Sequence, residues 1–287
     1  MDKNFEIENT SFLSYDDTYL DKNSYPNFQD KLLEFKKLVN TNYRDSLSKT
    51  YYKFGDGDYY FLKKEAFGSA RPGRRAIKKP YYLIPHKKFT KGALKNDYYL
   101  NRIQTPHQDM FFEIFGKSMD FPSEFVYGLT ANKWFFEKYN SDIGIIGADK
   151  KIEIINLLMD KEEYKEYLKL DAFSDYISIP QKYAVDKISN IEKNIKKSLE
   201  YSTSKIFLVG IGHVKSGLLY KLKEYKKNVQ FIDIGVGMDA IAGIVNNDRP
   251  YFGDWKNYRL KNEKIYGDVD FLIKKDKVSE IVTHKFI

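Results

Sequence analysis

The sequence predicts an α/β fold: a Rossmann-like, mostly parallel sheet with helices on both faces and a basic insertion after the first strand. Strand patterns alternate with helix patterns along the chain, and two of the strand patterns are apolar throughout. Strands of this kind are buried on both faces, which is typical of parallel sheets. The 287 residues, 42% of them hydrophobic, suffice for one such core, and no Ser-, Gly- or Pro-rich linker divides them. We therefore expect a single domain over 1–287.

The local patterns place the elements in order. An N-terminal helical extension, 1–49, carries apolar residues at helical spacing between Phe28 and Val39. The predicted strands are 50–54, 125–129, 143–147, 176–179, 205–209 and 229–234. The predicted helices after the first strand are 59–67, 151–159, 160–171, 185–199 and 216–225. The basic insertion at 68–124 and a C-terminal hairpin at 268–287 account for the remaining segments.

Composition excludes several classes of chemistry. The chain contains no cysteine, which rules out disulfides, thiolate zinc sites, iron–sulfur clusters and a cysteine nucleophile. Its N-terminal segment is acidic and polar, whereas a signal peptide is basic and then apolar, so we read it as mature sequence. No apolar run approaches the roughly 20 residues that cross a bilayer. These features predict a soluble, cytoplasmic protein.

The positive charge is concentrated in one window. Residues 53–102 hold 13 basic and 4 acidic residues, a net charge of +9, against +8 for the whole chain. Three of the basic residues, Arg71, Arg74 and Arg75, lie within five positions. The planar guanidinium suits bidentate contacts with phosphate. The window therefore indicates a phosphate-facing segment, with a lysine-rich solvated surface as the alternative.

The segment FGDGD at 54–58 follows the first predicted strand. It places Asp56 and Asp58 one residue apart, with Gly55 and Gly57 beside them. Glycine lets the backbone bend so that two such carboxylates converge on one hard cation. Mg²⁺ or Mn²⁺ is commonly held by one or two carboxylates together with substrate phosphates. A metal site is therefore one interpretation, and an ordinary surface turn is the other.

The segment VGIGHVKSG at 209–217 follows a predicted strand and opens a helix. In this setting backbone N–H groups and the helix N-terminus bind phosphate. The spacing is neither that of a Walker loop nor a complete GxGxxG, because Lys215 stands where the third glycine belongs. We interpret Gly210, Gly212, His213 and Ser216 as a cradle for phosphate or ribose, with a structural role as the alternative for His213.

The last motif group is FIDIGVGMD at 231–239, followed by NNDRPY at 246–251. The first follows a strand and matches the DxGxG pattern of S-adenosylmethionine methyltransferases, although that pattern normally opens the domain. In the second, Arg249 suits a phosphate and Tyr251 suits stacking on a base. Both follow the carboxyl end of the last predicted strand, where α/β sheets bind ligands.

Taken together, FGDGD, VGIGHVKSG, FIDIGVGMDAIAG and NDRPY resemble the GT-D-type glycosyltransferases, a Rossmann-like family, in motif order from 53 to 251. The first motif of that family usually reads RFGDGE, and its carboxylates bind the metal that holds a nucleotide-sugar diphosphate. Here Lys53 replaces the arginine and Asp58 replaces the glutamate. The change produces an Asp-x-Asp motif, which other metal-dependent glycosyltransferases use.

The resemblance implies a role for each singled-out residue. Asp56 and Asp58 would bind Mn²⁺ or Mg²⁺, and Asp239 or Asp233 would deprotonate the acceptor hydroxyl. For Asp233 the alternative is a strand-end residue that accepts backbone N–H groups. The donor, in the first place a UDP-sugar, would contact the following residues: Gly55, Gly57, Arg71, Arg74, Arg75, Gly210, Gly212, His213, Ser216, Arg249 and Tyr251.

These roles predict a metal-dependent glycosyltransferase, a hexosyl- or pentosyltransferase, whose acceptor is a saccharide or glycoconjugate. The basic window with its interleaved tyrosines favours a second interpretation, a DNA-modifying glycosyltransferase that acts on a hydroxylated base. A methyltransferase that uses S-adenosylmethionine and a nucleic-acid-binding module without enzymatic activity are further alternatives.

Overall fold

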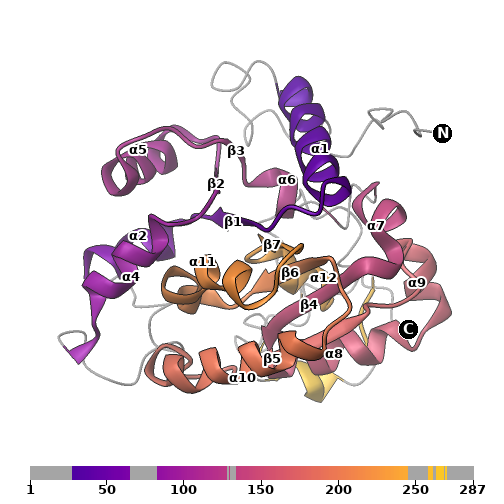
Figure 1. Cartoon of the computed structure of the whole chain (residues 1–287). Helices are drawn as coiled ribbons and strands as arrows, with labels where there is room; N and C mark the ends of the chain where they lie inside the picture. The colour runs from indigo at the N-terminus through magenta and orange to yellow at the C-terminus, as the bar shows by residue number, and fades with distance from the viewer. Residues whose placement is uncertain are drawn as a thin grey trace.

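The structure, a computed structural model, describes residues 28–64, 83–127, 129, 134–244, 258–260, 263–267 and 269. It confirms the α/β fold: seven strands form one sheet in the order β3-β2-β1-β7-β6-β4-β5, and every neighbouring pair is parallel (Figure 1). The strands are β1 (Lys49–Lys53), β2 (Tyr98–Asn101), β3 (Phe121–Pro122), β4 (Ile143–Ala148), β5 (Asp175–Ile179), β6 (Ile206–Gly210) and β7 (Gln230–Asp233).

Helices cover both faces of the sheet and enclose two hydrophobic cores (Figure 1). One face carries α1 (Phe28–Arg44), α6 (Glu124–Tyr127), α7 (Trp134–Tyr139), α8 (Asp149–Met159), α9 (Glu162–Leu168) and α12 (Gly237–Ile241). The other carries α2 (Asp56–Lys63), α4 (His86–Ala93), α5 (Thr105–Phe115), α10 (Ile188–Tyr201) and α11 (Lys215–Tyr225). Short 3₁₀ turns are η4 (Asn140–Asp142), η5 (Val185–Lys187), η6 (Gly212–Val214) and η8 (Glu263–Tyr266). Within the described ranges, no helix has the length and apolar character needed to span a membrane.

Strand side chains alternate between the two cores. Tyr51 and Tyr52 of β1 are both fully buried, one in each core. Each hydroxyl has a partner: Tyr51 donates to Gln230 at 2.7 Å, and the Tyr52 and Ser216 hydroxyls lie 2.8 Å apart. Two tyrosines therefore fill the centre of the sheet without leaving a buried polar group unsatisfied.

Three expectations from the sequence need correction. The strand expected at 125–129 is wrong: Phe125 and Val126 belong to α6, because a short run of buried apolar residues does not distinguish a strand from a helix. The strand at this place, β3, is instead two residues long and lies at the sheet edge, where Pro122 removes no ladder hydrogen bond. The described part of the expected insertion at 68–124 contains α4, β2, α5 and β3, so it belongs to the sheet.

The third correction concerns helix α2. It begins at Asp56, three residues before the expected start at 59, so both predicted metal ligands lie in its first turn. The rest of the expected insertion, 68–82, and most of the expected hairpin at 268–287 lie outside the described residues.

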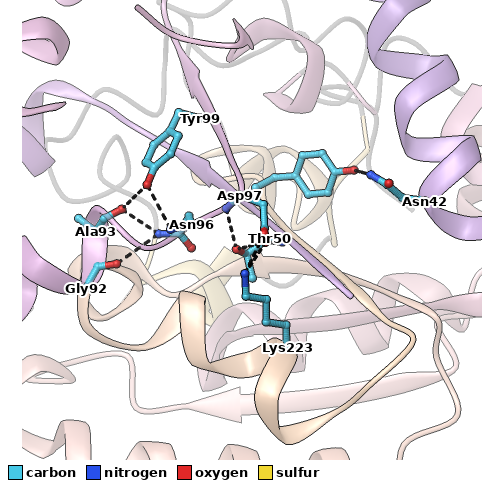
Figure 2. A network of polar contacts seen from close by, with 9 residues as sticks. Asn42, Thr50, Gly92, Ala93, Asn96, Asp97, Tyr99 and Lys223 are labelled. Carbon is cyan, nitrogen blue, oxygen red and sulfur yellow. Dashed lines mark hydrogen bonds and ion pairs between the residues drawn. The ribbon is translucent and has the colours of Figure 1, made fainter. Parts of the chain in front are cut away.

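A polar network joins the amino ends of β1 and β2 to α11 (Figure 2). Asp97 Oδ2 accepts the backbone N–H of Thr50 at 2.8 Å and its hydroxyl at 2.9 Å. The ammonium of Lys223 donates to the same carboxylate at 2.8 Å. One carboxylate therefore sets the start of both strands relative to the helix that covers them.

We expect Asp97→Ala to lower the free energy of unfolding by about 1 to 3 kcal/mol, because the N–H and hydroxyl of Thr50 lose their acceptor. Urea denaturation measures the change. The matched variant is Lys223→Met, which removes only a partly exposed ion pair and should cost less than about 1 kcal/mol. Equal losses in the two variants would contradict this assignment.

The connections at the carboxyl edge of the sheet position the candidate site. β1 leads to α2, and β6 leads through η6 to α11, both on the same face. β7 lies between these two strands, yet it leads to α12 on the opposite face. Neighbouring strands whose loops leave toward opposite faces mark the place where α/β sheets bind ligands. Three of the sequence motifs therefore meet at the end of β7.

Candidate functional site

The site is organised around Lys215, the first residue of α11. Its side chain is buried, with 4% of its surface exposed. The ammonium lies 2.9 Å from Oδ2 of Asp58 and 2.8 Å from Oδ2 of Asp233, and it donates to the backbone carbonyl of Lys53. One cation thus joins the loops that follow β1, β6 and β7.

Asp58 lies in the first turn of α2 and is almost fully buried. Its Oδ2 accepts the N–H of Gly55 at 3.0 Å, and its Oδ1 lies 3.6 Å from Nδ1 of His213. Burial alone would raise the pKa of Asp58, but Lys215, His213 and Lys53 together lower it to about 2. Asp58 is therefore a charged residue at any physiological pH.

Asp233, the last residue of β7, accepts backbone N–H groups on both sides. Its Oδ2 accepts the N–H of Lys53 at 3.2 Å and its Oδ1 that of Gly235 at 3.0 Å. Burial raises its pKa, and the ion pair with Lys215 partly offsets this effect. The contacts match the strand-end role considered as an alternative above, because they tie β7 to the end of β1.

The two predicted metal ligands point to different sides of α2. Asp56 is exposed, with its Oδ1 accepting the N–H of Gly57 at 2.8 Å, whereas Asp58 is buried. Residues two apart on a helix do not face each other, which explains the separation. No group of three or more acidic or histidine residues in the described ranges is arranged to hold a metal ion. An ion bound here would take Asp56 as its protein ligand, because the carboxylate of Asp58 is already paired with Lys215.

The glycine-containing loop after β6 is filled largely by protein. A Cβ on Gly210 would lie 2.8 Å from Cβ of Met238, so this glycine permits the close approach of α12 to β6. Gly212 is exposed with φ +56° and has open space beside it. The Ser216 hydroxyl is buried against Tyr52, so it does not face a phosphate. His213 stacks on Phe61, with ring centroids 4.6 Å apart.

The remaining predicted residues lie elsewhere. Asp239, on α12, forms an ion pair with Lys151 of α8 on the other face of the sheet. Gly55 precedes α2 and Gly57 lies in its first turn, next to Asp58, which is paired with Lys215. Five predicted donor contacts fall outside the described residues: Arg71, Arg74, Arg75, Arg249 and Tyr251.

Sequence reasoning did not assign a role to the side chain of Lys53. This side chain runs between two glycines: a Cβ on Gly55 would lie 3.0 Å from its Nζ, and one on Gly235 would lie 2.9 Å from its Cδ. Gly235 also has φ +51°, so both its conformation and its space require glycine. The glycines of two motifs thus accommodate the lysine that replaces the arginine of the first motif.

A second group of missed residues lies at the ends of β2 and β3. Arg102 follows β2, His107 lies on α5, and Glu124 opens α6 two residues after the end of β3. Nη1 of Arg102 lies 3.2 Å from Nε2 of His107. Arg102 was visible in the sequence as part of the basic window, whereas nothing in the local sequence marks His107 or Glu124, since both depend on β2 and β3 lying next to β1.

No protein-family model, curated protein or solved structure matches the chain. The resemblance to GT-D-type glycosyltransferases stays a prediction from the sequence motifs.

We expect Lys215→Met to lower the free energy of unfolding by about 3 to 5 kcal/mol, because it leaves two buried carboxylates without their cation. Guanidinium or urea denaturation measures the loss. Lys221→Met, on the same helix but in the partly exposed pair with Glu192, should cost about 1 kcal/mol or less. Adding Asp58→Asn to Lys215→Met should restore part of the free energy of unfolding, because one of the two unpaired buried charges is then removed. A double variant as unstable as Lys215→Met would contradict the pairing.

Proposed function

We propose that this protein is a glycosyltransferase that moves a sugar from a nucleotide-sugar donor to a hydroxyl acceptor, in the first place on a saccharide or glycoconjugate. The observation that supports the proposal most is the meeting of three motifs, far apart in the sequence, around Lys215. All three are among the motifs that resemble GT-D-type glycosyltransferases, and they meet at the edge where α/β sheets bind nucleotides.

The charges at this edge suit a diphosphate. The side chain of Lys53, the last residue of β1, lies beside Gly55 at the start of α2, where helix N-terminal N–H groups add partial positive charge. Asp58 and Asp233 are both paired with Lys215, so they do not oppose an incoming anion as unpaired charges would. The side chain of Lys53 would thus contact the donor phosphates and stabilise the leaving nucleoside diphosphate.

A divalent cation belongs to the same proposal. Asp56 is exposed at the first position of α2 and would hold Mg²⁺ or Mn²⁺ together with the donor phosphates and water, an arrangement that Mg²⁺ commonly adopts. When bound, the ion would supply electrostatic stabilisation of the diphosphate.

We expect nucleotide sugars, UDP-sugars first, to raise the melting temperature of the wild type in the presence of Mn²⁺, because a ligand that binds only the folded state stabilises it. Asp56→Ala should lose the metal-dependent part of this shift. The control variant is Asp160→Ala, which removes an exposed carboxylate at the C-cap of α8. This variant should show the same metal-dependent shift as the wild type. A wild type that no nucleotide sugar stabilises with Mn²⁺ would refute the proposal.

A DNA acceptor is the second candidate, and α4 favours it. Lys87, Lys88 and Lys91 are exposed on this short helix, which contacts both α2 and α11. Cations on one helix beside the site would contact a phosphate backbone.

If DNA is the acceptor, duplex DNA should bind in a gel shift at low salt and dissociate as salt increases, because counterions are released on binding. Replacing Lys87, Lys88 and Lys91 together by Ala should weaken this binding. The same triple change at Lys193, Lys196 and Lys197 of α10 provides the control for charge. Absence of any shift at low salt would leave the saccharide acceptor as the proposal.

A further inference from the structure

A buried carboxylate at the same edge of the sheet has a different environment from Asp58 and Asp233. Glu124 is 1% exposed and lies two residues after the end of β3, next to the end of β2. In the described part of the chain its carboxylate forms no ion pair. It accepts the backbone N–H groups of Ile103 and of Glu124 itself, and the Ser123 hydroxyl lies 3.5 Å from its Oε2. Glu124 is therefore a buried acid without a dedicated counter-ion.

Its proton affinity follows from this environment. Burial raises the pKa of Glu124 to about 7, and its own backbone N–H, the positive charges of Arg102 and Lys53 and the N–H of Ile103 only partly oppose the increase. Asp58, whose cation is in direct contact, has a pKa of about 2. Of these two carboxylates at the edge, Glu124 alone exchanges a proton near neutral pH.

Polar atoms without partners surround the same strand ends. Asn101 is completely buried and its Nδ2 donates to the carbonyl of His107 at 2.8 Å, yet its Oδ1 has no partner among the described residues. Nδ1 of His107 is also buried without a hydrogen-bond partner among the described residues. The Ser123 N–H donates to the Asn101 carbonyl at 2.7 Å, which holds Glu124 beside this group.

The chemistry of these atoms indicates the ligand. Burial and Arg102 lower the pKa of His107 to about 4, so its imidazole is neutral. The carboxamide oxygen of Asn101 accepts hydrogen bonds only, and buried acceptors of this kind are normally satisfied by a donor. A hydroxyl group supplies such a donor. A saccharide, which carries several hydroxyls, would fill these positions together.

On the basis of the proposed glycosyl transfer, we infer that Glu124 is the proton acceptor of the reaction and that Asn101 and His107 bind the acceptor sugar. The acceptor oxygen attacks the anomeric carbon of the donor and forms the new C–O bond. The bond from that carbon to the diphosphate oxygen breaks, and the nucleoside diphosphate leaves with the electron pair. The hydroxyl proton moves to the carboxylate of Glu124.

The two carboxylates expected from the sequence suit this role less well. Asp239 is paired with Lys151, and Asp233 holds Lys215 and two backbone N–H groups. Taking a proton would require either residue to give up these contacts. Glu124 also accepts two backbone N–H groups, but it gives up no ion pair of the described chain when it becomes protonated.

The test compares Glu124→Gln with the wild type, with UDP-glucose or another nucleotide sugar that stabilises the protein as donor, and methyl glycosides and water as acceptors. We expect the turnover rate to fall 100-fold or more, as general-base loss typically does, while the donor-induced thermal shift is kept. The wild-type rate should rise with pH through about 7, where Glu124 loses its proton, and this rise should vanish in the variant. Glu137→Gln, an exposed change on α7, should alter neither property.

A readout without turnover comes from stability. The folded state holds the Glu124 proton up to about pH 7, whereas the unfolded state releases it near the ordinary pKa of 4.5. The free energy of unfolding of the wild type should therefore fall, relative to that of Glu124→Gln, as the pH rises from 4.5 to 7. Should the Gln variant not fold, Glu124→Asp decides the question: a reduced rate that still depends on pH supports the assignment, and an unchanged rate overturns it.

The failures are separable. No donor binding by the wild type refutes the proposed function itself. Donor binding with a wild-type rate and pH profile in Glu124→Gln, or a wild-type rate that is constant from pH 6 to 8, overturns the role of Glu124 and leaves the proposed function intact.

Discussion

The ammonium of Lys215 is the contact on which the carboxyl edge of the sheet depends. It lies between Asp58 and Asp233 and donates to the carbonyl of Lys53. In the sequence Asp58 is 157 positions and Lys53 162 positions before Lys215, whereas Asp233 is 18 positions after it. Each buried charge would be unfavourable alone, because leaving water costs several kcal/mol per ion. Their mutual pairing and the added backbone N–H donors offset that cost. The same contacts position the starts of α2 and α11.

The glycines around Lys215 and the strand ends leave room for neighbouring side chains. Gly55 and Gly235 leave room for the side chain of Lys53, and Gly210 leaves room for Met238. The sequence predicted Gly210 as part of an open cradle for phosphate and Gly55 as a donor contact, and it assigned no role to Gly235. In the structure all three are close-contact positions: Gly55 and Gly235 border the buried side chain of Lys53, and Gly210 borders Met238 of α12.

Local patterns sufficed for the parts of the fold that are apolar along their whole length. β4 is buried throughout and β6 up to its last residue, and the helices α8, α10 and α11 were located to within a few residues. The pattern failed at β2, whose YYLN sequence lies in the lysine-rich window, and at α6, where buried apolar residues form a short helix. The meeting of three motifs at one edge was predictable from the strand-end rule. The roles of Lys215 and Glu124 were not, because they depend on which strands become neighbours.

Asp58 and Glu124, both at this edge of the sheet, differ in pKa because the fold places a cation against one and not against the other. Asp58 lies where the loop after β6 delivers a lysine, so its charge is fixed. Glu124 lies one strand beyond β2, where Arg102 and Lys53 act on it without direct pairing, so its charge responds to pH. The proposed transfer reaction, which binds an anionic donor and moves a proton, would use Glu124 as the carboxylate whose charge can change. The strand order β3-β2-β1-β7 provides this separation along a single edge.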